Sequence, residues 1–229
     1  MSVLFCLATP LGNLSDLSVR ATETLRSVDA ILCEDTRVTA KLLAHLGISK
    51  PLLSVHQHSD GKRLLQVWHL VEEGKRLALV TDAGTPGISD PGGYLIQEAV
   101  RRFGDALKIV PIPGPCAAIA ALSVSGFPTD AFLFLGFPPH KKGRKKFFDR
   151  IGSTDETVVF YESPHRILKT LEELAPCMGN RPVLVARELT KIHETLYRGS
   201  IAQVTDSLKN GSMKGEFVIV VAPKSFMIT

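Results

Sequence analysis

Long hydrophobic runs are absent from this sequence of 229 residues, in which no tract approaches the roughly 18 consecutive apolar residues that span a bilayer. The amino terminus, MSVLFCLATPLGNL, also lacks the basic region that opens a secretion signal. The content of 45% hydrophobic and 22% charged residues is typical of a globular protein. We therefore expect a cytoplasmic protein that has no membrane partner.

Cysteine is scarce, and no two cysteines show the spacing of two to four residues that zinc sites use. We expect reduced thiols at all four positions, Cys6, Cys33, Cys116 and Cys177. Among the seven histidines only His56 and His58 are close, and on a strand they would face the same side. A solvated or substrate-facing pair is favoured over a zinc site, so the sequence predicts no metal.

Two common nucleotide-binding signatures are missing as well. No G-x-G-x-x-G follows the first strand-like run, and no G-x-x-x-x-G-K-[ST] occurs anywhere. Dinucleotide-linked hydride transfer and P-loop phosphoryl transfer are therefore disfavoured. The net charge of +4 permits a polyanionic partner without requiring one.

Short apolar runs alternate with helical patterns in the first half of the chain, which is the rhythm of βαβ units. The predicted strands span residues 3–8, 30–33, 76–81 and 108–112. The predicted helices span about 19–28, 36–47, 60–74 and 92–103. The run RLALVT (76–81) is continuously apolar, as buried parallel strands are.

The segment IPGP (112–115) is a stiff break, because each proline fixes its own φ and disfavours helix in the residue before it. Beyond it the sequence predicts strands at 132–136, 157–161, 182–188 and 216–222, and helices at 116–126, 164–175 and 200–210. The region around ETLYRGS (194–200) can pair as a hairpin. We expect two α/β domains, 1–112 and 113–229, with an interdomain cleft as the default ligand site.

The segment DAGTPGIS (82–89) begins at the carboxyl end of the strand 76–81, and open α/β sheets bind ligands outside the carboxyl ends of their strands. Gly84 would let the backbone approach a ligand closely, and Asp82 can bond a ribose hydroxyl or a cationic group. The alternative is a plain strand-to-helix turn that ends near Pro91. The residues alone leave both interpretations open.

The segment HKKGRKK (140–146) concentrates positive charge. Its basic residues are Lys141, Lys142, Arg144, Lys145 and Lys146. Such a run is usually a solvated loop, but at the mouth of a cleft it would neutralise phosphates and bind RNA with a strong salt dependence. It indicates a polyanion rather than a particular nucleotide sequence.

The chain carries seven ordered segments: TPLGNL (9–14), EDTR (34–37), DAGTPGISDPG (82–92), PIPGPCAA (111–118), FYESPHR (160–166), ARELTKIHE (186–194) and KGEFVIVV (214–221). In this order they resemble the tetrapyrrole methylase superfamily, from about residue 3 to about residue 222. Within it, EDTR, YESPHR and RELTK are similar to the ribosomal RNA small subunit methyltransferase I family, which methylates a cytidine 2′-hydroxyl. The resemblance implies the fold of class III S-adenosylmethionine methyltransferases.

The resemblance also implies that S-adenosylmethionine binds in the interdomain cleft. The positions that it assigns to cofactor binding in the first domain are Pro10, Ala83, Gly84, Thr85 and Ile88. Asp82 is counted as a cofactor position because its carboxylate can bond a ribose hydroxyl. Those that it assigns at and beyond the PGP turn are Cys116, Ala117, Tyr161, Glu162, Leu189 and Glu216. Longer family members continue past the last strand, so any RNA contact made by that extension would be missing from this chain.

EDTR (34–37) follows the strand 30–33 and is therefore expected at the same sheet edge as the DAGTP loop. A ribose hydroxyl is a poor nucleophile at neutral pH, so a proton acceptor and a cation would both help. We hypothesise that Glu34 or Asp35 assists proton removal and that Arg37 positions the ribose or its phosphate. The alternative is a helix start at which Asp35 or Thr36 caps and Arg37 is exposed.

The expected partner is small-subunit ribosomal RNA, free or in the ribosomal subunit, and the resemblance implies a homodimer. The first domain is expected to face the RNA and to hold part of the cofactor, and the second to complete the cofactor site. Two alternatives remain open: a methylase acting on a small tetrapyrrole, and a non-catalytic RNA-binding assembly factor on the same scaffold.

Overall fold

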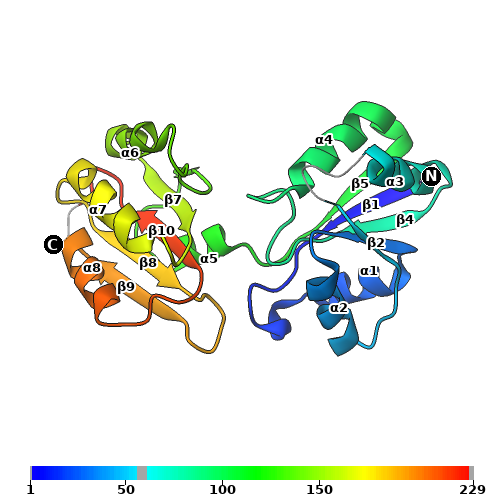
Figure 1. The fold of residues 1–229 in the computed structure, drawn as a ribbon, viewed down its shortest axis with the longest axis horizontal. Helices are drawn as coiled ribbons and strands as arrows, with labels where there is room; N and C mark the ends of the chain where they lie inside the picture. The colour runs from blue at the N-terminus through cyan, green and yellow to red at the C-terminus, as the bar shows by residue number, and fades with distance from the viewer. Residues whose placement is uncertain (1, 56–60, 227–229) are drawn as a thin grey trace. The chain divides into compact units, whose positions relative to one another are not determined.

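The computed structural model describes residues 2–55 and 61–226, so His56 and His58 lie outside the described residues. The chain divides into two compact units, Met1–Cys116 (unit 1) and Ala117–Thr229 (unit 2), and each is considered by itself (Figure 1). In the described ranges, no helix is both long and apolar enough to cross a membrane. Those ranges also hold no group of three or more His, Cys, Asp or Glu residues suited to a metal ion.

Unit 1 is built on a five-stranded parallel sheet with the strand order β3-β2-β4-β1-β5. The strands are β1 (Ser2–Leu7), β2 (Ala30–Cys33), β3 (Leu52–Ser54), β4 (Arg76–Leu79) and β5 (Leu107–Ile112). Because all five run in one direction, their carboxyl ends and the loops that follow them gather at one edge of the sheet.

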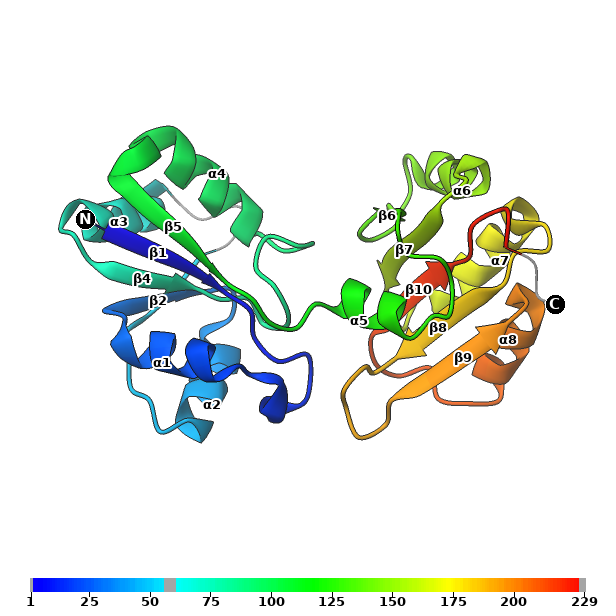
Figure 2. The same cartoon turned by 180° about the vertical axis from the view of Figure 1, so that it is seen from behind.

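Helices cover both faces of this sheet (Figure 2). On one face lie α1 (Val19–Ser27) and α2 (Thr36–His45), and on the other α3 (Gly61–Glu72) and α4 (Gly92–Phe103). Leu77 of β4 packs with Trp68 and Leu95, whereas the next residue, Ala78, packs with Leu25 on the opposite face. Two single-turn 3-10 helices, η1 (Leu14–Asp16) and η2 (Gly104–Ala106), complete the unit.

Unit 2 has a mixed sheet of order β6-β7-β10-β8-β9, in which only β6 and β7 pair in parallel. Its strands are β6 (Phe132–Phe134), β7 (Thr157–Glu162), β8 (Val183–Arg187), β9 (Thr195–Gly199) and β10 (Phe217–Val221). Its helices are α5 (Ala117–Ser123), α6 (Arg144–Ser153), α7 (Ile167–Met178) and α8 (Ile201–Lys209). The last three bury one continuous apolar core against the sheet.

Most of the predicted elements are confirmed, including the helix 92–103 and the pairing of 194–200 as β9 with β8. The sequence did not predict β3, which has only three residues. The expectation of a loop throughout 140–146 is wrong, because α6 begins at Arg144 and includes Lys145 and Lys146. The start of the helix predicted at Asp60 lies outside the described residues, and α3 is described from Gly61.

Candidate functional site

Hydrogen bonds to main-chain groups connect the loops that follow three adjacent strands of unit 1. The amide of Thr9, after β1, donates to the carbonyl of Gly84 at 2.9 Å, and the Gly84 amide donates back to Thr9 at 3.0 Å. The Thr85 hydroxyl donates to the carbonyl of Pro115, after β5, at 2.9 Å. Three of the predicted cofactor positions therefore lie in loops that are hydrogen-bonded to one another: Pro10, Gly84 and Thr85.

The backbone conformation and close contacts of the DAGTPGIS loop explain its glycines. Gly84 has φ +85°, and a Cβ placed there would lie 3.3 Å from Leu11 Cδ2. The Asp90 carboxylate accepts the amides of Gly87 at 2.8 Å and Gly92 at 2.6 Å. Hydrogen bonds within the loop therefore hold its shape. Ala83 and Ile88 are exposed on it.

EDTR begins α2, as the alternative interpretation proposed, but its side chains also form a local ion pair. Asp35 caps the helix by accepting the Arg37 amide at 2.8 Å, and its carboxylate also accepts bonds from the guanidinium, from Nε at 3.0 and 3.2 Å and from Nη2 at 2.6 Å. These bonds from Arg37 lower the pKa of the Asp35 carboxyl from 3.8 to about 2. Asp35 is therefore a weak proton acceptor near neutral pH.

Asp82 connects EDTR to the DAGTP loop. Its Oδ1 accepts the backbone amide of Asp35 at 3.1 Å, and the hydroxyl of the preceding residue, Thr81, donates to Glu34 Oε2 at 3.5 Å. This adjacency follows from the pairing of β2 with β4. A cavity of about 490 Å³ opens beside these groups, and it is lined by Glu34, Asp35, Thr36, Arg37, Ser54, Arg63 and Asp82.

In unit 2, Tyr161 near the end of β7 lies beside the first turn of α5. Its hydroxyl accepts the amide of Ala118 at 3.2 Å, and its ring contacts Phe134 and Phe137 edge-on at 5.1 and 5.4 Å. The predicted positions Ala117 and Tyr161 are thereby brought together, and both are half-buried.

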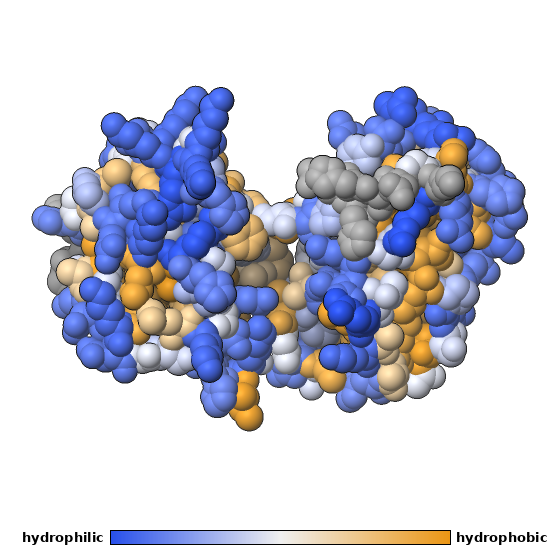
Figure 3. All heavy atoms as spheres, in the orientation of Figure 1, coloured by the Kyte–Doolittle hydropathy of each residue, from blue (hydrophilic) through white to orange (hydrophobic). Residues whose placement is uncertain are grey.

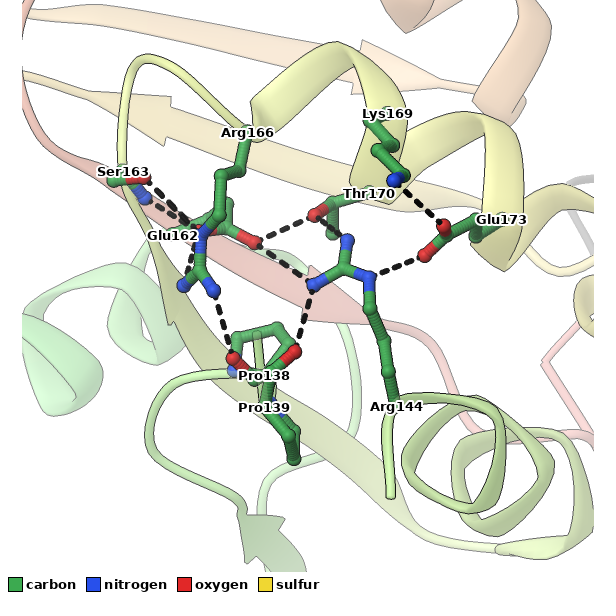
Figure 4. A network of polar contacts seen from close by, with 9 residues as sticks. All are labelled: Pro138, Pro139, Arg144, Glu162, Ser163, Arg166, Lys169, Thr170 and Glu173. Atoms are coloured by element: carbon green, nitrogen blue, oxygen red, sulfur yellow. Dashed lines mark hydrogen bonds and ion pairs between the residues drawn. The ribbon is translucent and has the colours of Figure 1, made fainter. Parts of the chain in front are cut away.

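The Glu162 side chain points into unit 2 and is fully buried (Figure 4). Its Oε1 accepts Arg166 Nε at 2.8 Å, its Oε2 accepts the Thr170 hydroxyl at 2.5 Å, and Arg144 Nη1 lies 3.9 Å from Oε2. A cofactor contact through the Glu162 side chain does not fit this placement. Only its main chain remains suitable.

Arg144 differs from the lysines that surround it in sequence. Its guanidinium donates to Glu173 at 2.5 Å, to the Thr170 hydroxyl at 2.7 Å and to the Pro139 carbonyl at 3.2 Å (Figure 4). Because Arg144 is buried and engaged in this way, we assign it to the interior of unit 2 rather than to RNA. The exposed residues of the segment are Lys141, Lys142, Lys145 and Lys146, and hydrophilic residues dominate the surface over α6 (Figure 3).

The last two predicted cofactor positions are Leu189, in the loop between β8 and β9, and Glu216, directly before β10. Glu188 has φ +53°, its amide donates to the Glu216 carbonyl at 2.9 Å, and its carboxylate accepts the Glu216 amide at 3.0 Å. Leu189 follows it and is half-buried. The Glu216 side chain is exposed and pairs with Lys191 at 3.1 Å, so the two predicted residues lie on segments that are bonded to each other.

Sequence reasoning missed two residues of unit 1 that the structure places at these sites. Asp90 organises the glycine-rich loop, and an aspartate close to glycines in a turn was a usable signal for it. Arg63 of α3 lines the 490 Å³ cavity, and no motif pointed to it.

The fold is shared with solved structures of low sequence identity. A diphthine synthase has a similar fold, with a TM-score of 0.70 and 16% identity, and the match covers 97% of this chain and 90% of that one. The methyltransferase CobJ has a TM-score of 0.69 and 19% identity, and the match covers 100% of this chain and 95% of CobJ. The family model of the Tetrapyrrole (Corrin/Porphyrin) Methylases matches residues 3–205. The chain belongs to the tetrapyrrole methylase family.

Curated relatives named "Ribosomal RNA small subunit methyltransferase I" are similar over nearly the whole chain. The Thermotoga maritima protein is 41% identical, covering 98% of this chain and 100% of its own length. The Xylella fastidiosa protein is 47% identical, covering 95% and 80%, and the Escherichia coli O157:H7 protein is 43% identical, covering 95% and 77%. The resemblance to this family seen in the sequence is confirmed.

Proposed function

We propose that the chain is an S-adenosylmethionine-dependent methyltransferase that methylates the 2′-hydroxyl of a cytidine in small-subunit (16S) ribosomal RNA. The observation that carries this proposal is the 3.1 Å hydrogen bond from the Asp35 amide to Asp82 Oδ1. It joins the segment expected to handle the acceptor to the loop expected to hold the donor. The ribosomal substrate is supported by relatives of that name at 41–47% identity.

The residues of the strand-end loops fit S-adenosylmethionine. Gly84 keeps side-chain atoms away from the point where the loops after β1, β4 and β5 meet, and Thr85 holds two of those loops together. The small residues Cys116 and Ala117 follow, and they leave room for a ligand beside the chain. When bound, the cofactor supplies an activated methyl group, so the protein must mainly align the acceptor oxygen.

Within this function, Glu34 is the proton acceptor for the ribose hydroxyl. Asp35 is the weaker choice because its carboxyl is held ionised by Arg37 and has a pKa of about 2. The Glu34 carboxylate accepts a hydrogen bond from the Thr81 hydroxyl, and this bond orients the carboxylate at the edge of the cavity. Asp35 and Arg37 form a pair at the start of α2, and this pair keeps the Asp35 amide within hydrogen-bond distance of Asp82.

The exposed lysines of the basic segment bind RNA phosphates in this proposal, and Arg144 holds the segment in place from within. In this proposal unit 1 presents the acceptor cavity and its own cofactor positions, and the cofactor positions of unit 2 are Tyr161, Leu189 and the main chain at Glu162. A ribosomal substrate would be met in the cytoplasm, and the proposal includes a homodimer, whose mass light scattering would measure.

The deciding experiment maps 2′-O-methyl groups on small-subunit ribosomal RNA from cells with and without this protein. We expect one cytidine to lose its methyl group, and expression of Glu34→Gln to leave it unmethylated while S-adenosylmethionine binding by the purified variant is unchanged. Loss of no site would contradict the proposal. S-adenosylmethionine binding without a lost site would favour a tetrapyrrole substrate, and no binding of S-adenosylmethionine would favour a non-catalytic assembly factor.

A further inference from the structure

The acceptor cavity has a second guanidinium, which comes from α3. Arg63 Nη1 donates to the carbonyl of Ser54, the last residue of β3, at 3.4 Å. The Ser54 hydroxyl in turn donates to the Glu34 carbonyl at 3.4 Å. Arg63 is therefore connected, through the end of β3, to the residue proposed to accept the proton.

The strand order gives these groups a direction along the sheet edge. The loops expected to hold the cofactor follow β5, β1 and β4, EDTR follows β2, and Ser54 ends β3. EDTR therefore lies between the donor loops on one side and the Ser54–Arg63 contact on the other. An RNA strand whose ribose reaches Glu34 therefore has the donor loops on one side and Arg63 on the other, in the same cavity.

The charges in the cavity favour the same arrangement. Its lining contains three carboxylates, from Glu34, Asp35 and Asp82, and two guanidiniums, from Arg37 and Arg63. Arg37 is bonded to Asp35 through both Nε and Nη2, so these two charges offset each other. Within the described part of the chain Arg63 forms no ion pair, and its side chain is exposed. An exposed guanidinium at this position can bind a phosphodiester that enters the cavity, which the carboxylates of the lining would otherwise repel.

We propose that Arg63 binds the backbone phosphodiester next to the acceptor ribose and so seats the 2′-hydroxyl at Glu34. This inference rests on the proposed function and adds an RNA contact to it. A guanidinium suits the role because its planar fork can bind two phosphate oxygens at once and thereby fixes orientation as well as position. Arg63 is a substrate-binding residue in this view, whereas Arg37 organises the protein.

The test compares Arg63→Ala and Arg63→Lys with a matched control, Arg26→Ala. Arg26 is also exposed but lies in the last turn of α1, just before β2 begins, and hence at the opposite edge of the sheet. The probe is the small ribosomal subunit isolated from cells that lack the protein. Binding is measured across a range of salt concentrations, and S-adenosylmethionine affinity is measured in parallel.

We expect Arg63→Ala to weaken subunit binding about tenfold and to reduce the salt slope by roughly 0.7 to 0.9, the value of one phosphate contact. Arg63→Lys should keep the slope but lose part of the affinity and turnover, because the forked contact is gone. S-adenosylmethionine affinity should not change in any variant. If Arg63→Ala matches Arg26→Ala in affinity and slope, this inference is overturned; if the unmodified protein does not bind the subunit, the proposed function falls with it.

Discussion

The two units hold their candidate functional residues in different ways. In unit 1 each of these bonds has a main-chain group on at least one side: Thr9 and Gly84 exchange amide–carbonyl bonds, and the Asp82 carboxylate accepts the backbone amide of Asp35. In unit 2 the equivalent place, the end of β7, is held by a buried side-chain network around Glu162. Backbone bonds survive most substitutions, whereas a side-chain network depends on the identity of each member.

The difference follows from the two sheets. An all-parallel sheet brings its loops to one edge, where neighbouring main chains can bond directly. In the mixed sheet of unit 2, β7 has the antiparallel β10 on one side and the short β6 on the other, so the turn after β7 needs other support. Arg144 and Arg166 supply it, and both also donate to carbonyls of the Pro138–Pro139 segment.

The largest effect should come from breaking the buried network. Glu162→Gln removes the charge that faces Arg144 and Arg166, and a buried pair broken on one side typically costs roughly 3–5 kcal/mol. We expect the free energy of unfolding of unit 2, measured by urea titration, to fall by that order. Glu173→Gln is the matched control: Glu173 pairs with the same Arg144 but is one-third exposed, so its loss should be well under half as large. Equal losses would show that burial does not set the cost.

A smaller loss of stability is expected when a side chain is added at Gly84, where the loops of unit 1 meet. Gly84→Ala places a Cβ 3.3 Å from Leu11 Cδ2 at φ +85°, and we expect a loss of about 1–2 kcal/mol in unfolding free energy together with weaker S-adenosylmethionine binding by calorimetry. Gly47→Ala is the control, because Gly47 has φ +64° but no atom within 4 Å of its added Cβ. It should show the backbone cost without the effect on binding. If Gly84→Ala binds S-adenosylmethionine as tightly as the unmodified protein, this loop does not contribute to cofactor binding.

The comparison also shows what the sequence could and could not predict. The helix α4 was predicted from Gly92 to Phe103 because glycines and prolines mark its limits. In contrast α6 was missed, because five basic residues in a run of seven conceal the apolar face that continues through Phe148 and Ile151. The position of Gly84 at a strand end followed from the βα pattern, which is a local signal.

Contacts that depend on strand order were not predictable from local patterns. Asp35 and Asp82 meet because β2 pairs with β4, although α2, β3 and α3 separate the two strands in sequence. The interior role of Arg144 was hidden for a similar reason, since its partners Thr170 and Glu173 lie on α7. Sequence periodicity gives the elements and their faces, but not which side chains distant elements bring together.

A single side-chain bond in unit 1 gives a still smaller expected effect. Thr85→Val removes the hydroxyl that donates to the Pro115 carbonyl at 2.9 Å while keeping the shape of the side chain, so we expect a loss of about 1 kcal/mol in unfolding free energy. Thr85→Ser keeps the hydroxyl and should retain most of that stability. Both variants should leave the Thr9–Gly84 main-chain bonds in place. A loss as large as that of Glu162→Gln would remove the distinction between the two units.

The smallest effect is expected for the ion pair between half-buried Asp35 and exposed Arg37, and it should depend on pH. The folded-state pKa of Asp35 is lowered from 3.8 to about 2, so its ionised form stabilises the protein above pH 3.8, and this contribution is lost as the pH falls through about 2. Asp35→Asn keeps an oxygen that can cap α2 but removes the charge. The unfolding free energies of the two proteins should therefore differ slightly at pH 5 and converge between pH 3.8 and about 2. A difference that stays constant across that window would mean that the Asp35 charge does not contribute, and that the carboxylate acts only as a helix cap.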